Sequence, residues 1–259
     1  MVAEREHPRE VSGSGHVRVG TSGWHYEHWR GAFYPADVPP GQWLDFYVEQ
    51  FDTVEINNTF YRLPAESTFE AWHEAAPPGF VFAVKASRYI THMKKLRDPE
   101  EPLANFVERA GLLGDRLGPI LFQLPPRWSF NPQRLASFLA ALPPGYRYAF
   151  ELRDPSWLNE RTYGLLAAHN AALCIYELAG QRSPRQVTAD FVYVRLHGPG
   201  GAYEGRYSTQ ALGAWADDMT RWAAQGCDVY CYFDNDQAGY AAQNALEMQQ
   251  MLRAQPAEG

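Results

Sequence analysis

Ionisable residues stand at or just after the ends of several short apolar segments in this sequence. Seven residues share that position: Glu55, Lys85, Glu151, Arg153, Arg195, His197 and Asp234. Side chains two residues apart in an extended strand share a face, and these residues lie on the face opposite the bulky apolar side chains. If the segments are parallel strands, their charged ends meet at one edge of the sheet.

This mixture of side chains favours acid–base chemistry on an anion. The candidate catalytic residues are Glu55, Lys85, Glu151 and His197. Carboxylates and histidine transfer protons near neutral pH, while a desolvated lysine can also form a Schiff base with a carbonyl substrate. Arg153 and Arg195 are candidates for binding the anion, because a guanidinium donates two parallel hydrogen bonds to a phosphate or carboxylate.

A structural interpretation of the same residues stays open. Charges at strand ends also occur as a solvated rim or as an ion-pair network that only supports the fold. Burying several charges is costly unless they are paired or hydrogen bonded. Convergence of seven such residues from five strands favours a functional site.

Polar and aromatic residues in the following loops extend the candidate site. Besides the two arginines, the candidate substrate-binding residues are Thr21, Gly23, Trp24, Asn57, Tyr61, Gln123, Asp234 and Asn235. Glycine and small hydroxyl residues after a strand can present backbone N–H groups to an anion. Aromatic rings beside a polar pocket suit a sugar or a nucleobase.

The elements that must position these residues are short β-rich runs alternating with amphipathic stretches. The runs are 17–20, 53–57, 80–85, 119–124, 147–152, 172–176, 191–196 and 228–233. Clear helical patterns cover 41–50, 102–114, 132–142, 159–170, 208–225 and 239–252. This alternation predicts parallel strands with helical crossovers. Eight units in a chain of 259 residues predict a single α/β domain, a (βα)8 TIM barrel, with a doubly wound sheet as the alternative.

Two regions depart from the regular repeat. Residues 177–190 show little helical periodicity, so we expect the sixth βα unit to be irregular. Residues 1–16 are charged and then rich in glycine and serine, which predicts a disordered tail before a barrel domain at 17–255.

Composition limits the partners and the compartment. The net charge of −7 and a pI near 5.6 disfavour indiscriminate nucleic-acid binding, although a local basic pocket stays compatible with them. The chain has three cysteines and no apolar leader or membrane-length apolar run, which favours a reducing, cytoplasmic location away from membranes. Cys227 and Cys231 have no second Cys/His pair to complete a zinc site.

Several motifs together resemble the YecE-like family of domains of unknown function. They are GTSGW at 20–24, VEIN at 54–57, FQLPP at 122–126, FELR at 150–153, VRLHG at 194–198 and YFDND at 232–236. The resemblance implies a TIM barrel and no settled activity. Barrels of this family have been compared with those of endonuclease IV and xylose isomerase, a comparison at the level of the fold. The family more often has Asn at the position of Asp234 and His at that of Asp154.

Three functions remain open from the sequence. The first is a cofactor-free hydrolase or lyase acting on a small anionic substrate, resembling a phosphorylated sugar or a nucleotide. The second is a metal-dependent nuclease or isomerase, in which Glu55, Glu151, Asp234 and His197 hold a divalent ion, although the neighbouring lysine and arginines would repel it. The third is a non-catalytic protein that binds single-stranded nucleic acid or a small ligand. The oligomeric state is left open.

Overall fold

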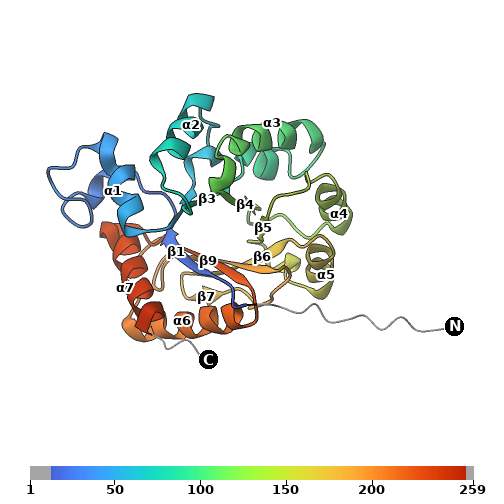
Figure 1. The fold of residues 1–259 in the computed structure, drawn as a ribbon. Helices are drawn as coiled ribbons and strands as arrows, with labels where there is room; N and C mark the ends of the chain where they lie inside the picture. Colours follow the sequence, from blue (N-terminus) through green and yellow to red (C-terminus); the bar gives the residue numbers. More distant parts are fainter. Residues whose placement is uncertain (1–12, 255–259) are drawn as a thin grey trace.

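The computed structural model describes residues 13–254, and within them eight parallel strands form a nearly closed barrel surrounded by helices (Figure 1). The parallel strands are β1 (Val17–Thr21), β2 (Thr53–Ile56), β3 (Val81–Lys85), β4 (Leu117–Gln123), β5 (Tyr148–Glu151), β6 (Ala172–Leu178), β8 (Phe191–Leu196) and β9 (Asp228–Phe233). The predicted α/β TIM barrel is therefore confirmed, and each of the eight predicted runs overlaps one strand.

The hydrogen-bonded strand order is β1-β9-β8-β6-β5-β4-β3-β2. Between β1 and β2 the barrel closes through a single isolated bridge, Ser22 with Glu55, where the Gly23 amide donates to the Glu55 carbonyl at 2.8 Å. Gly20 permits this close approach, because a Cβ there would lie 2.1 Å from the carbonyl oxygen of Thr53. We call this junction of β1 and β2 the seam.

A tyrosine from the first helix completes the seam. The buried Tyr47 hydroxyl accepts from the Thr21 amide at 3.0 Å and donates to the Thr53 carbonyl at 3.1 Å. These backbone groups of β1 and β2 are therefore satisfied by a side chain where ladder hydrogen bonds would otherwise be needed.

The helices cover the outside of the barrel, so that β strands and helices form two layers (Figure 1). They are α1 (Trp43–Gln50), α2 (Glu66–Ala75), α3 (Glu100–Gly111), α4 (Pro132–Ala140), α5 (Glu160–Ala168), α6 (Thr209–Ala224) and α7 (Tyr240–Ala254). Capping side chains precede two of these helices: Ser208 accepts from the Ala211 amide, and Asn131 from the Arg134 amide. The helix α2 has no counterpart among the clear patterns, since Phe69 is its one buried residue.

The sixth unit is irregular, as predicted. Where a crossover helix would follow β6, the chain turns back into β7 (Gln181–Arg182), which pairs antiparallel with the end of β6. Within 179–190 the structure has no helix.

Two apolar layers follow from the alternation of side chains along the strands. One fills the barrel interior and consists mainly of Ala83, Leu121, Ala149, Ala172, Cys174, Phe191, Tyr193, Tyr230 and Tyr232. The other packs the outward faces of the strands against the helices, with Trp43, Trp157 and Trp215 fully buried. The charged residues predicted on the inward face therefore stand above a packed interior, at the carboxyl ends of the strands.

Most of the predicted tail lies outside the described residues, as does residue 255 of the predicted domain. The last residues of that tail are described: the Gly15 amide donates to the Ala223 carbonyl, and the Val229 amide to the His16 carbonyl, each at 2.8 Å. In the described part of the chain, no helix has the length and apolar character needed to cross a membrane.

Candidate active site

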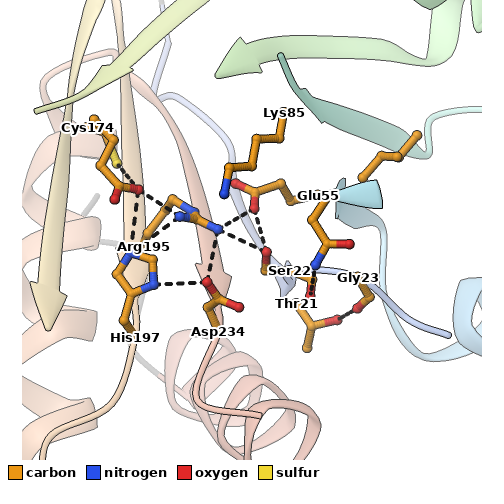
Figure 2. A network of polar contacts seen from close by, with 12 residues as sticks. Thr21, Ser22, Gly23, Glu55, Lys85, Cys174, Arg195, His197 and Asp234 are labelled. Carbon is orange, nitrogen blue, oxygen red and sulfur yellow. Dashed lines mark hydrogen bonds and ion pairs between the residues drawn. The ribbon is translucent and has the colours of Figure 1, made fainter. Parts of the chain in front are cut away.

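Arg195 of β8 lies at the centre of the carboxyl-end mouth of the barrel, where its guanidinium reaches three carboxylates (Figure 2). Its Nη1 donates to Oε2 of Glu151 at 2.7 Å, and its Nη2 donates to Oε1 of Glu55 at 2.7 Å and to Oδ2 of Asp234 at 3.0 Å. The Arg195 side chain is 1% exposed. These ion pairs raise the pKa of Arg195, against the opposing effect of burial.

Glu55 of β2 is fixed by neutral hydroxyl groups as well as by Arg195. The Tyr193 hydroxyl donates to Oε2 at 2.6 Å, and the Ser22 hydroxyl donates to Oε1 at 2.5 Å. Both oxygens of this fully buried carboxylate are therefore occupied, as expected for an ionised group inside a protein.

Glu151 of β5 is held by a second arginine. Arg153 Nε donates to its Oε1, and the Cys174 thiol lies 4.0 Å from its Oε2. Burial raises the pKa of Glu151, but Arg153 and Arg195 lower it more, so it lies well below its usual value. Burial beside Glu151 raises the pKa of the Cys174 thiol. Glu151 is thus a carboxylate and Cys174 a thiol at neutral pH.

His197 connects the arginines to Asp234. Arg153 Nη2 lies 3.1 Å from His197 Nε2, and His197 Nδ1 lies 2.9 Å from Oδ2 of Asp234. A carboxylate can only accept, so Nδ1–H donates to Asp234, while Nε2 lies between the Arg153 guanidinium and Oε2 of Glu151, which is 3.4 Å away. Burial raises the pKa of Asp234, but Arg195 and the His197 hydrogen bond lower it more. The Asp234 side chain is 14% exposed, whereas His197 and both glutamates are fully covered.

Lys85 of β3 points into the same mouth (Figure 2) and differs from the other members in having no ion pair within 4 Å among residues 13–254. Its ammonium lies 4.4 Å from the ring centroid of Phe60. Burial and the nearby Arg195 lower the pKa of Lys85, although Glu55, Glu151 and Asp234 oppose them. We name these seven residues the Arg195 cluster: Glu55, Lys85, Glu151, Arg153, Arg195, His197 and Asp234.

The loop after β8 covers part of the cluster. Tyr203, in this loop, packs edge-on against His197 with ring centroids 5.4 Å apart. Its left-handed backbone (φ 66°) is held by a hydrogen bond from its amide to the His197 carbonyl at 2.6 Å. Tyr203 is 44% exposed, so its phenol faces both the cluster and solvent.

The other residues predicted for substrate binding lie at or beyond the edge of the cluster. Asn57 donates to the Ser22 carbonyl and the Tyr26 hydroxyl. Gln123 pairs with Glu151 in the strand register, and its side-chain oxygen is buried without a hydrogen-bond partner in the described structure. Tyr61 is 73% exposed.

Four of the predicted residues have structural contacts instead. Trp24 is buried against Trp72 and Phe82. Thr21 and Gly23 shape the seam, where the Thr21 hydroxyl donates to the Gly23 carbonyl at 2.7 Å. Asn235 donates to the Gly205 carbonyl and thereby holds the loop that carries Tyr203.

Three contacting residues were not singled out from the sequence: Ser22, Cys174 and Tyr193. Tyr193 shares its strand face with Arg195 and His197, so alternation alone could have identified it. Ser22 stands within the GTSGW motif. Nothing in the sequence separates Cys174 from an ordinary core thiol.

The donor set does not favour a metal ion. In the range 13–254, no three His, Cys, Asp or Glu side chains are arranged to hold one. The carboxylate oxygens that face each other across the mouth bind the Arg195 guanidinium, which takes the central position a cation would need.

Comparisons with known proteins cover almost the whole chain. The family model described as "Protein of unknown function DUF72" matches residues 18–258. The UPF0759 protein YunF of Bacillus subtilis (strain 168) is 26% identical over 273 residues, 91% of this chain and 94% of YunF. The UPF0759 protein YecE of Escherichia coli (strain K12) is 32% identical over 117 residues, 44% of this chain and 42% of YecE.

A solved structure of similar length is also close in sequence. The crystal structure of a DUF72 family protein from Thermotoga maritima MSB8 is 31% identical, with a TM-score of 0.84 over 92% of this chain and 99% of that one.

Proposed function

Since the chain belongs to the DUF72 family, the YecE-like family of unknown function that its motifs resemble, we propose its function from the site alone. The protein is a metal-independent enzyme, a hydrolase or lyase, that acts on a small anionic substrate at the mouth of the barrel. Family membership supplies the fold, and the chemistry is inferred from the Arg195 cluster.

The observation that carries the proposal is the unpaired ammonium of Lys85. The acidic members of the cluster are already bound to Arg195 or Arg153, whereas no carboxylate among the described residues lies within ion-pair distance of Lys85. A cation that is largely desolvated and unpaired is costly. An anionic group of a substrate would supply the missing partner.

The remaining roles follow from what each side chain leaves free. Arg153 is 9% exposed on its side chain and can add a second contact to the anion. Asp234 uses Oδ2 for Arg195 and His197, so Oδ1 is left to accept a hydrogen bond from a substrate hydroxyl or a water. Burial raises the pKa of Tyr203, which keeps its phenol protonated and able to donate.

The fully buried residues of the Arg195 cluster act on the substrate indirectly, by positioning the residues that contact it. Glu55, Glu151 and His197 fix the positions of Arg195 and Asp234. The charges of Glu55 and Glu151 also act on Lys85. Preorganised charges of this kind stabilise charge that develops during a reaction. The Arg195 guanidinium lies between the carboxylates, which supports a reaction that does not use a divalent ion.

A second candidate makes Lys85 a nucleophile toward a carbonyl substrate. Burial and the neighbouring Arg195 lower the pKa of Lys85, which increases the fraction of free amine, the form that acts as a nucleophile in Schiff-base lysines. The amine nitrogen attacks the carbonyl carbon, the carbonyl oxygen leaves as water, and an imine remains. Borohydride added together with pyruvate or glyceraldehyde 3-phosphate would then reduce the imine and leave the substrate covalently attached to Lys85. If mass spectrometry finds the peptide containing Lys85 unmodified, this candidate is removed.

The main proposal is tested by ligand-dependent thermal stability. Inorganic phosphate and a panel of sugar phosphates and nucleotides are titrated against the protein and its Lys85→Met variant. A ligand at about 100 times its Kd stabilises the native state by about 2.7 kcal/mol, which raises the Tm by about 5–10 °C for a chain of this size. The proposal predicts such a shift in the parent protein and its loss in Lys85→Met.

An equal shift in Lys85→Met would contradict the proposed role of Lys85. A shift that requires added Mg²⁺, Mn²⁺ or Zn²⁺ and disappears with a chelator would contradict metal independence. A cytoplasmic location belongs to the same proposal and agrees with the three cysteines, Cys174, Cys227 and Cys231, being free thiols.

A further inference from the structure

Positive charge gathers in three loop segments that follow neighbouring strands. Residues 57–65, 86–97 and 124–135 contain no Asp or Glu, while the chain as a whole has a net charge of −7. Their lysines and arginines are Arg62, Arg88, Lys94, Lys95, Arg97, Arg127 and Arg134. We call these seven residues the basic patch.

The three segments are also neighbours in space. They follow β2, β3 and β4, which are adjacent in the barrel. The rings of Phe60 and His92 lie 5.0 Å apart, which joins the first segment to the second. Arg134 Nη1 donates to the Lys95 carbonyl at 3.2 Å, which joins the second to the third. The segments that carry the basic patch are therefore joined side by side, and the first of them includes Phe60, which contacts Lys85.

Most charges of the basic patch are exposed to solvent and make no ion pair within the described residues. Arg62, Arg88, Lys95, Arg97 and Arg127 are exposed. Within residues 13–254, only Lys94 has a carboxylate within 4 Å, the 85% exposed Asp98 at 3.5 Å. A surface selected only for solubility would mix both signs of charge, so seven cations with a single neighbouring carboxylate among the described residues, that of Asp98, indicate an anionic partner.

Exposed apolar side chains stand among these cations. Tyr61 is 73% exposed, Met93 66% and Tyr89 48%. They are three of the five large hydrophobic side chains exposed in the described chain, the others being Tyr146 and Tyr203. Flat rings interleaved with cations are the surface that stacks nucleobases while it binds phosphates.

The backbone beneath the patch is held in costly conformations. Lys95 (φ 48°), Leu96 (φ 62°) and Arg127 (φ 60°) are left-handed without being glycine. The segment Tyr89–Met93 is a short π-helix. Both features are rare and gather at functional surfaces.

We propose that the basic patch binds single-stranded nucleic acid, with phosphates on its arginines and lysines and bases against Tyr61 and Tyr89. The spacing of rings and charges favours a single strand over a duplex, because paired bases offer no faces for stacking. A lipid surface would instead require an amphipathic helix with a broad apolar face, whereas the patch consists of loops. The binding is separate from turnover at the Arg195 cluster and does not depend on it.

The test measures binding of fluorescent twelve-nucleotide oligothymidylate and oligouridylate by anisotropy, from 25 to 200 mM salt. Arg88→Gln/Arg97→Gln removes two patch charges, and Arg221→Gln/Arg253→Gln removes two from the ends of α6 and α7 as a matched control. For single strands, the logarithm of the binding constant falls with the logarithm of the salt concentration with a slope of about 0.7 per phosphate contact. The patch variant loses two contacts, so its slope should be smaller by about 1.4. The control keeps the parent slope.

The aromatic contribution is tested in the same assay. Tyr89→Ala is expected to weaken binding about tenfold, whereas Tyr146→Ala, which removes an exposed tyrosine outside the patch, leaves it unchanged. The proposal would be overturned by no binding at 25 mM salt, by equal affinity for a blunt duplex of the same length, or by equal losses in patch and control variants. Preference for phosphatidylserine vesicles over both oligonucleotides would assign the patch to a membrane and also overturn it.

Discussion

The Nη2 atom of Arg195 lies 2.7 Å from Oε1 of Glu55, although their strands, β8 and β2, are separated by β9 and β1 in the barrel. The ion pair therefore crosses the barrel mouth and does not run along one edge. The same guanidinium reaches Glu151 of β5 from its other nitrogen. One side chain thus joins strands on different sides of the barrel and neutralises charges that would otherwise repel.

Replacing Arg195 with methionine should destabilise the protein strongly. The variant leaves Glu55 buried without its arginine and leaves Glu151 with Arg153 alone, and breaking a buried pair in this way costs about 3–5 kcal/mol. Urea denaturation measures the loss. Arg221→Met, at a mostly exposed arginine of α6, is the control and should change the unfolding free energy by less than about 1 kcal/mol. A loss of that small size at Arg195 would mean that the cluster is solvated.

Stability should fall in acid because of Glu151. Its pKa in the folded protein lies well below the reference value of 4.5, so as pH falls the unfolded chain takes up the proton first. The contribution is complete above the unfolded-state pKa and is lost as pH falls toward the folded-state pKa. The unfolding free energy, measured by urea denaturation between pH 7 and pH 3, should therefore fall less steeply with decreasing pH in Glu151→Gln than in the parent protein. Glu160→Gln, on the exposed start of α5, should keep the parent slope; equal slopes in all three proteins would contradict this assignment.

Removing Lys85 should stabilise the protein while removing ligand binding. Its pKa in the folded state lies below the reference value of 10.5, so the folded protein holds this proton less strongly than the unfolded chain. The penalty is complete at neutral pH and decreases as pH rises through the folded-state pKa. Lys85→Met should gain about 1 kcal/mol at pH 7, and the gain should shrink toward pH 10. A destabilised variant at pH 7 would identify Lys85 as a structural residue.

Asp234→Asn should keep both the fold and the affinity for an anion. Asp234 accepts from Arg195 and His197 through the single atom Oδ2, and an asparagine oxygen in that place can accept both. The change removes one charge, so affinity for an anion should rise or stay level. Asp234→Ala leaves both donors without the acceptor and should cost about 1–3 kcal/mol. Equal loss of stability in both variants would mean that the charge, and not the acceptor, matters.

Alternation along the strands, taken together with the barrel, predicts which charged residues lie near one another. Glu55, Glu151 and Arg195 were assigned to inward faces from a period of two, and the structure places them within hydrogen-bond distance of one another through Arg195. The barrel supplied the rest, because parallel strands bring their carboxyl ends to one side. The sixth unit was predicted as irregular because residues 177–190 lack a helical period, and β7 takes that place.

Loop residues were harder to place from the sequence, because a loop has no periodicity that fixes the direction of a side chain. Trp24 follows a strand as Asp234 does, yet its ring packs against Trp72, outside the cluster. The sequence also counted Arg195 among the anion-binding groups, and only the distances reveal how many carboxylates already surround it. The number of ion pairs a residue makes depends on tertiary contacts that a single sequence does not contain.

The seam between β1 and β2 couples assembly of the barrel to assembly of the cluster. Ser22 and Glu55 form the single bridge that closes the sheet, and the same two side chains contact Arg195. An intermediate in which β1 and β2 have separated keeps the seven parallel pairings between the other neighbouring strands but lacks a complete cluster. A ligand that binds only to the intact cluster therefore also stabilises the contact between β1 and β2. Such a ligand should slow amide hydrogen exchange at Thr21 and Gly23, far along the chain from Lys85, more than exchange elsewhere in the sheet.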